Sequence, residues 1–202
     1  MNVTSRADLP GNYREIWHLD LLHDKKDLIL VNGVGVVLMV LLLGAGNWMV
    51  PQEALFDLEG GLIPYVMRFV VLILGVFVYT LLHELVHGVL MRRFSGVRPR
   101  YGFAGTYAYA GSDAYFNKRD YIIIALAPVV VWGVVLAILT AAVPYSWFWP
   151  VWFIQVTNLS GAAGDLYVTW RFAALPPDIL VRDVGVAMTV YAPEPGEKTT
   201  EV

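Results

Sequence analysis

The sequence contains no cysteine, which removes disulfide bonds, thiolate metal ligands and a cysteine nucleophile from consideration. Charge is also scarce, since charged residues make up only 15% of the 202 residues and the formal net charge is -3. No block of basic residues offers a phosphate-binding face, so we expect no nucleic-acid partner. Hydrophobic residues reach 57% and the mean hydropathy is +0.58, which is too apolar for an ordinary soluble domain and indicates a lipid bilayer as the surroundings.

Four apolar stretches are long enough to cross a bilayer, which takes about 20 residues in a helix. They cover residues 28–50, 62–91, 121–143 and 147–170. The first follows a charged lead of 27 residues and has no small-residue cleavage site behind it, so we interpret it as a retained helix and not as a secretory signal. The expected fold is an all-α polytopic membrane protein with four transmembrane helices.

The expected organisation has three parts. Residues 1–27 form an interfacial, cytoplasmic lead, residues 28–170 the four-helix transmembrane domain, and residues 171–202 a cytoplasmic tail, of which the last nine residues are expected to be disordered. Between the second and third helices, the run RPRYGFAGTYAYAGSDAYFNKRD alternates aromatic residues in part and predicts a short β-hairpin or a re-entrant loop. The tail contains two short strand-like runs around Asp183 and Gly185.

The basic residues predict the orientation in the cell membrane, because Lys and Arg of short loops remain on the cytoplasmic side. Thirteen of the fourteen lie in the lead, in the segment between the second and third helices, or in the tail. The exception is Arg68, near the start of the second helix, where we expect its side chain to extend outward to the interface. Both termini are therefore expected in the cytoplasm.

A cluster of polar residues interrupts the second apolar stretch, where residues 83–87 read HELVH. On a helix, His83 and His87 project about 40° apart and lie about 6 Å apart along the axis, so both imidazoles can bind one metal ion. Glu84 lies on the same side, where a general base can take a proton from a metal-bound water. Ionisable groups inside a membrane helix indicate function, although histidines at a helix end that bond to neighbouring helices are the alternative interpretation.

Two histidines and a water leave a tetrahedral Zn²⁺ one ligand short. Asp165 is the candidate for the third ligand, because it is the only acidic residue within the third and fourth predicted helices. Its depth also matches: Asp165 lies about 9 Å before Arg171, and His87 and His83 lie about 7 and 13 Å before Arg92, at 1.5 Å per residue. The alternatives are less favoured because all lie in interfacial or loop segments; they are His18, His23, Asp113 and Asp120.

Asn158 precedes Asp165 by seven residues and therefore shares a face with it on a continuous helix. It is a candidate to hold the backbone of a substrate or to stabilise an oxyanion above the metal. An interhelical hydrogen bond without a catalytic part is the equally weighted alternative. The small residues at 161–164 allow close helix packing at this depth.

Three motifs together, HELVH, ALAPVVVWG and NLSGAAGD, resemble the site-2-protease type of intramembrane zinc metalloprotease. The chain is more closely similar to a family of small four-helix membrane proteins described as "putative zincin peptidase", over nearly its whole length. This resemblance implies that His83, His87 and Asp165 are Zn²⁺ ligands, that Glu84 is the catalytic carboxylate, and that residues 28–170 form a metalloprotease-like domain. One departure is that site-2 proteases place their carboxylate ligand in an LDG setting, whereas Asp165 here lies between Gly164 and Leu166.

The expected function is hydrolysis of peptide bonds in membrane-embedded or membrane-associated protein substrates, near the cytoplasmic face, by a zinc metalloendopeptidase. A zinc-binding membrane protein that holds or regulates a partner helix without cleaving it is the alternative. Glu84 distinguishes the two, because a purely structural zinc site has no need of it. Zinc transport is disfavoured, since the titratable groups cluster at one depth and no other helix offers a second site.

Overall fold

The computed structural model of the chain describes residues 4–20, 23–105 and 107–194. Within these residues it contains both helices and strands. In chain order they are β1 (Tyr13–Asp20), α1 (Lys25–Met49), the 3-10 helix η1 (Gln52–Phe56), α2 (Leu62–Ser95), β2 (Arg100–Ala104), β3 (Tyr107–Gly111), β4 (Tyr115–Asn117), α3 (Lys118–Ala142), the 3-10 helix η2 (Tyr145–Trp147), α4 (Phe148–Gly161), α5 (Ala163–Ala173), β5 (Leu180–Asp183) and β6 (Ala187–Pro193).

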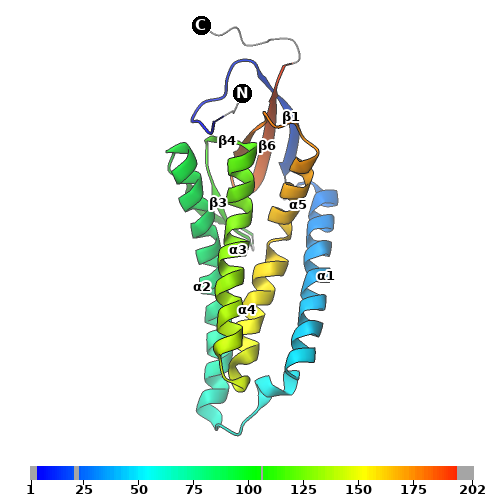
Figure 1. Ribbon diagram of the computed structural model, residues 1–202, viewed down its shortest axis with the longest axis vertical. Coiled ribbons are helices and arrows are strands. Elements are labelled where there is room, and N and C mark those ends of the chain that lie inside the picture. The colour runs from blue at the N-terminus through cyan, green and yellow to red at the C-terminus, as the bar shows by residue number, and fades with distance from the viewer. Residues whose placement is uncertain (1–3, 21–22, 106, 195–202) are drawn as a thin grey trace. The chain divides into compact units, whose positions relative to one another are not determined.

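The chain divides into two compact units. The first unit comprises Met1–Ile29, Glu84–Ala127 and Leu166–Val202, and the second comprises Leu30–His83 and Pro128–Asp165. The helix α2 contributes to both, and it runs from its first residue to its last without a break (Figure 1). Residues that follow one another on α2 are therefore positioned by the geometry of that helix.

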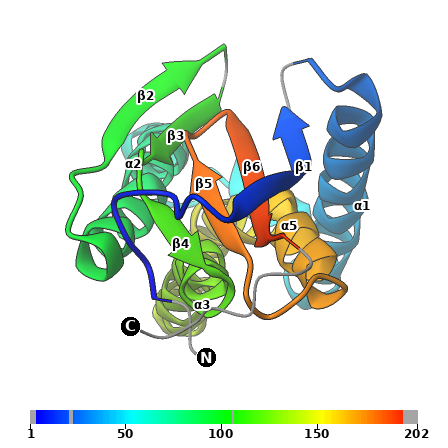
Figure 2. The ribbon, with the colours of Figure 1, turned by 90° about the horizontal axis from the view of Figure 1, so that it is seen from above.

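The first unit contains a four-stranded antiparallel sheet in the order β1-β6-β5-β4, which Figure 2 shows from above. Strand β6 alternates between partly and fully buried residues, and its buried side chains are Met188, Val190 and Ala192. They join an apolar core in which Phe116 and Phe172 are completely inaccessible. Burying large apolar side chains of this kind stabilises the unit by about 1.5–3 kcal/mol for each residue.

The expectation of an all-α fold is wrong, because this sheet joins the lead to the tail. Residues expected to lie on the membrane surface form β1, which pairs antiparallel with β6 from Tyr13 opposite Pro193 to Asp20 opposite Ala187. The fold is therefore mixed α and β. The two strand-like runs expected in the tail are confirmed as β5 and β6. Of the nine last residues expected to be disordered, 195–202 lie outside the described residues, and the N–H of Glu194 donates a hydrogen bond to the carbonyl of Asn12.

The hairpin expected between the second and third helices is confirmed. Strands β2 and β3 pair antiparallel, from Arg100 opposite Gly111 to Ala104 opposite Tyr107, and form a two-stranded sheet. Gly105 in the connecting turn has a φ of 61°, a conformation that favours glycine because it has no Cβ. Strand β3 thus has β2 on one side, and no other strand of the described residues pairs with its outer edge.

Three helices are long and apolar enough to span a membrane, and they are α1, α2 and α3. They correspond to the first three predicted spans. Large apolar side chains on them are exposed, among them Ile29, Leu41, Ile73 and Ile138, as expected for helices that face lipid. The fourth predicted span, 147–170, is not one helix. The helix is interrupted at Ala162, so that the segment forms two shorter helices, α4 with 14 residues and α5 with 11 residues.

The second unit has its own apolar cluster, formed by Val50, Ala54, Leu55, Phe148 and Trp149. Arg68 of α2 does not extend outward as predicted; only 2% of its surface is exposed. Its guanidinium donates hydrogen bonds to the backbone carbonyls of Ala54, Asp57 and Ser146. These carbonyls lie in or beside η1 and η2. The buried guanidinium therefore links the connection between α1 and α2 to the connection between α3 and α4.

Candidate metal centre

The residues of the HELVH motif lie on consecutive turns of α2, as predicted. His83 and His87 are one turn apart, and both are buried, with 9% and 8% of their surfaces exposed. Glu84 is partly exposed. The uninterrupted helix separates the Cα atoms of His83 and His87 by about 6 Å along the axis, and this spacing allows both imidazoles to reach one ion.

Asp165 lies in the first turn of α5, and the interruption at Ala162 decides its position. Within the second unit, its Oδ2 is 3.5 Å from Nε2 of His83, and its side chain is 24% exposed. The atoms that His83, His87 and Asp165 can offer to a metal lie within 4.8 Å of one another. Two imidazoles and one carboxylate are a ligand set typical of Zn²⁺, so the residues present fit the ion that the sequence predicts.

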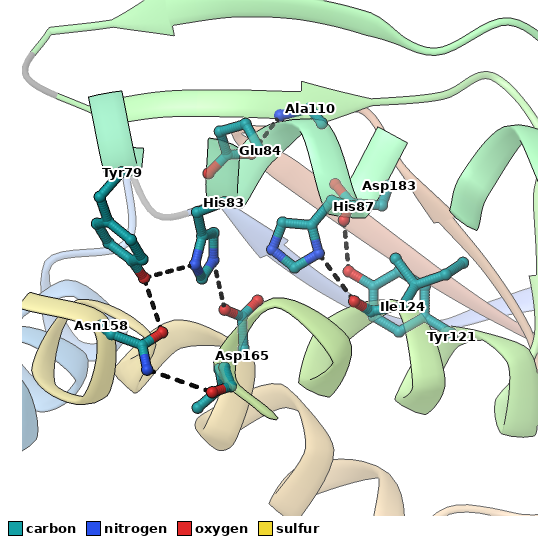
Figure 3. A network of polar contacts seen from close by, with 11 residues as sticks. Tyr79, His83, Glu84, His87, Ala110, Tyr121, Ile124, Asn158, Asp165 and Asp183 are labelled. Carbon is teal, nitrogen blue, oxygen red and sulfur yellow. Dashed lines mark hydrogen bonds and ion pairs between the residues drawn. The ribbon is translucent and has the colours of Figure 1, made fainter. Parts of the chain in front are cut away.

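A hydrogen bond with Tyr79 orients the ring of His83 (Figure 3). The hydroxyl of Tyr79 is 2.8 Å from Nδ1 of His83 and donates to Oδ1 of Asn158 over 2.9 Å. The amide of Asn158 is oriented in turn, because its Nδ2 donates to the carbonyl of Val129 over 3.2 Å and only the NH₂ group can do so. Since Tyr79 donates its proton to Asn158, it accepts the proton of His83 Nδ1, which leaves Nε2 as the ligand nitrogen facing Asp165.

Asn158 is completely buried, and the break at Ala162 places it on α4 while Asp165 lies on α5. The expectation that both share one face of a single helix is therefore wrong. The side chain makes the interhelical hydrogen bonds of the alternative interpretation. Contact of Asn158 with a substrate or an oxyanion stays a prediction.

The position of Glu84 depends on the hairpin. Its Oε2 accepts a hydrogen bond of 2.7 Å from the backbone N–H of Ala110 in β3. One turn further along α2, Gly88 leaves room for the ring of Tyr101, whose hydroxyl group occupies the space where a Cβ would lie. Burial, and next the negative charge of Glu84, raise the pKa of Tyr101, so its hydroxyl stays protonated at neutral pH.

The other acids and histidines considered as ligands have different partners. His18 is bonded to Thr189 over 3.1 Å, and His23 to Asp20 over 2.7 Å. Asp120 accepts hydrogen bonds from Ser5 and Asn117, and Asp113 pairs with Arg182 and Arg100. The hydrogen bond from Arg182, with the charge of Arg100, lowers the pKa of Asp113 below its ordinary value. Among the described residues, only His83, His87 and Asp165 form a group that can hold a metal.

Sequence reasoning missed Tyr79, although a signal existed. Tyr79 stands four residues before His83 on α2, so the two side chains are neighbours on one face of the helix. The ring centroids are 5.8 Å apart in an edge-to-face arrangement. A tyrosine in an apolar helix is otherwise indistinguishable from an ordinary packing residue.

We predict that Tyr79→Phe weakens Zn²⁺ binding about tenfold, because partners that orient a ligating histidine contribute about 10- to 100-fold to metal affinity. The phenyl ring fills the same space, but Oδ1 of Asn158 and Nδ1 of His83 lose this buried partner, so the metal-free protein should remain folded and melt at a somewhat lower temperature. Competition with a chromophoric chelator on detergent-purified protein measures the affinity. Tyr65→Phe, on the same helix but with its ring tilted against that of Phe69, is the matched control. Equal affinities for wild type and Tyr79→Phe would contradict the assigned role.

Comparison with known proteins identifies the family of this chain. Residues 76–180, which include HELVH and Asp165, match the sequence profile of a family described as "Putative zincin peptidase". A protein of Pyrococcus woesei, named "Uncharacterized 24.7 kDa protein in gap 5'region", is 30% identical over 131 residues, which cover 61% of this chain and 57% of that protein. The chain thus spans somewhat more than half of the relative that it matches. No solved structure matches the chain significantly. The family description indicates a zinc metallopeptidase, and the profile covers more than half of the chain, so the chain belongs to the "Putative zincin peptidase" family.

Proposed function

We propose that the protein is an intramembrane zinc metalloprotease, related to the site-2-protease type, that hydrolyses membrane-associated protein substrates near the cytoplasmic face. One observation carries the proposal: HELVH lies on an apolar helix of membrane-spanning length, and His83 faces Asp165 at 3.5 Å. Glu84 follows His83 directly, and its carboxylate does not belong to the group of metal-ligand candidates. A purely structural zinc site has no use for this residue, whereas a hydrolase needs a base there.

The residues divide the chemistry among them. A bound Zn²⁺ would polarise the scissile carbonyl and make its water ligand acidic. His83, His87 and Asp165 hold the ion, and Tyr79 keeps the proton of His83 on Nδ1. Glu84 accepts the proton of the attacking water on its carboxylate and delivers it to the leaving amine. Tyr101, protonated and close to Glu84, is placed to donate a hydrogen bond to the substrate.

The location of the site supports a substrate within or beside the membrane. The basic residues that flank α1, α2 and α3 predict that the end of α2 with His87, Arg92 and Arg93 faces the cytoplasm. Peptide groups of a transmembrane helix are protected by their own hydrogen bonds, so a substrate must unwind locally before it is cleaved. A strand edge beside Glu84 offers the unwound segment new partners.

Strand β3 is that edge. Because the N–H of Ala110 points to Glu84, it points away from β2, and the two-residue period of a strand gives Ala108 the same direction. An extended substrate can therefore pair with β3 by β-augmentation and lie alongside the catalytic carboxylate. This pairing uses backbone groups and fits substrates of varied sequence.

The test compares cells that produce the wild type with cells that produce Glu84→Gln. The N-termini of membrane-protein fragments are determined by mass spectrometry in both. New termini present only with the wild type, located within or next to predicted spans on the cytoplasmic side, are the expected result. Termini confined to soluble segments would contradict intramembrane cleavage. Zinc binding without any new terminus would favour the non-proteolytic role, in which the protein holds or regulates a partner helix.

We predict that Ala108→Pro lowers cleavage of such a substrate by about tenfold, because a paired backbone hydrogen bond is lost and the proline ring obstructs the edge. Zinc content and the β2–β3 ladder should be preserved, since the N–H of Ala108 points away from β2. Phe103→Pro is the matched control: Phe103 pairs with Ala108, and its N–H faces the opposite edge of the hairpin. Equal loss in both variants, or no loss in either, would remove the substrate-pairing role of β3.

A further inference from the structure

Helix α3 contains a proline in its interior, Pro128. In a regular α-helix the N–H of residue 128 would donate to the carbonyl of residue 124, but proline has no N–H and its ring crowds that carbonyl. Ile124 is 1% exposed and Pro128 is fully buried, so water has little access to the carbonyl. A buried carbonyl without its helical donor requires another partner.

His87 is that partner. Its Nδ1 is 2.9 Å from the carbonyl oxygen of Ile124, and Figure 3 shows the imidazole directed at this carbonyl. A carbonyl oxygen can only accept a hydrogen bond, so Nδ1 of His87 carries the proton. The nitrogen left to ligate a metal is Nε2, the same nitrogen that His83 presents. Both histidines are thus held in one tautomer, although by different means.

The apolar composition of α3 explains why the acceptor of the His87 proton is a backbone carbonyl and not a side chain. Residues 122–131 read IIIALAPVVV and contain no polar side chain that could accept the proton of His87. In an uninterrupted helix the carbonyl of residue 124 would already accept the N–H of residue 128, and His87 would share it with that donor. His83 depends on the side chain of Tyr79, whereas His87 donates to a carbonyl that the missing N–H of Pro128 leaves without its helical donor.

We infer that Pro128 is a positioning residue of the metal centre: its missing N–H reserves the Ile124 carbonyl for His87 and so fixes the tautomer and the ring orientation of this ligand. This rests on the zinc site of the proposed function. Pro128 touches no reacting atom in this scheme and acts through the carbonyl four residues before it.

Replacement of Pro128 by alanine tests the inference, because alanine restores the N–H. Full-length protein is purified in detergent and stripped of metal, and the Kd for Zn²⁺ is measured by competition with a chromophoric chelator. The melting temperature of the metal-free protein is recorded beside it. Pro64→Ala, in the first turn of α2, is the matched control, because no interior helical carbonyl is affected there.

We expect Pro128→Ala to bind Zn²⁺ about tenfold more weakly than the wild type, in the range of other partners that orient a ligating histidine. The melting temperature of the metal-free variant should be unchanged or higher, because the helix gains a hydrogen bond. Pro64→Ala should bind as the wild type does. Unchanged affinity of Pro128→Ala overturns the inference while the zinc site stands. A wild type that binds no Zn²⁺ overturns both the inference and the proposed function.

A second variant separates the missing N–H from the shape of the ring. Lactic acid in place of residue 128 gives an ester, which lacks both the N–H and the pyrrolidine ring. Its Kd for Zn²⁺ should match that of the wild type. If the ester variant is weakened as much as Pro128→Ala, the bend made by the ring is responsible and the assigned role of the missing N–H is wrong. If Pro128→Ala melts at a lower temperature than the wild type, the Kd of the ester variant still tests the role of the missing N–H.

Discussion

Asp165→Ala is expected to reduce the zinc content of purified protein from about one ion per chain to a small fraction, because two histidines alone hold Zn²⁺ weakly. The loss in affinity should exceed the roughly 100-fold that outer partners of a ligand contribute. Elemental analysis after gel filtration measures the content. Asp165→Asn, which has the same shape and a neutral amide, should lose the metal as well, so that altered packing cannot explain the result.

Two aspartates that the sequence also allows as ligands serve as controls. Asp113 is held by Arg182 and Arg100, and Asp120 by Ser5 and Asn117. Asp113→Ala and Asp120→Ala should therefore retain about one zinc per chain. Full zinc content in Asp165→Ala, together with loss in either control, would assign the third ligand to that aspartate, Asp113 in the loop after β3 or Asp120 in the first turn of α3. Wild-type protein that keeps its fold and takes up no zinc would end the metalloprotease interpretation altogether.

The parts of the centre that sequence reasoning predicted depend on local geometry. HELVH needs only an α-helix to bring its histidines to one side, and the apolar composition around it makes that helix long. Depth along the helix axes then pointed to Asp165, which the structure brings to 3.5 Å from His83. These conclusions use spacings within one or two turns, where the rise per residue constrains position closely.

The strand β1 could not be predicted, because its partner is far away in sequence and its own pattern is irregular. It pairs with β6 in the tail, and the register shifts between Glu15 and Trp17. Such a bulge interrupts the alternation of inward and outward side chains that identifies a strand. With charged residues beside Ile16, Trp17 and Leu19, the segment instead has the composition of a helix or a coil at a membrane surface.

The interruption at Ala162 could not be predicted either, because the residues around it fit more than one structure. The run of small residues at 161–164 is compatible with close helix packing as well as with an interruption, and apolar composition continues on both sides. Any interruption of the helix alters the rotation of all residues after it, so the relation inferred between Asn158 and Asp165 no longer holds. The hydrogen bonds of Asn158 to Tyr79 and Val129 become apparent only once the three helices are packed.

Glu84→Gln should lower the rate of substrate cleavage by about 10²- to 10⁴-fold, the contribution of a positioned general base, while about one zinc per chain is retained. Glutamine has the same length, and its amide oxygen can still accept the hydrogen bond from Ala110, so the local structure is kept. What is lost is the ability to take a proton from water, since an amide is not basic at neutral pH. Zinc is unaffected because Glu84 does not belong to the ligand group.

This combination distinguishes a base from a ligand and from a packing residue. A ligand variant such as Asp165→Ala loses metal and activity together, whereas Glu84→Gln should lose activity alone. The measurement is the rate at which purified protein in proteoliposomes cleaves a substrate identified from its cellular fragments. Glu53→Gln, an exposed acid in η1, is the matched control and should cleave at the wild-type rate. A Glu84→Gln protein that cleaves as fast as this control would show that the carboxylate is not the base, and the hydrogen bond to β3 would then be its structural purpose.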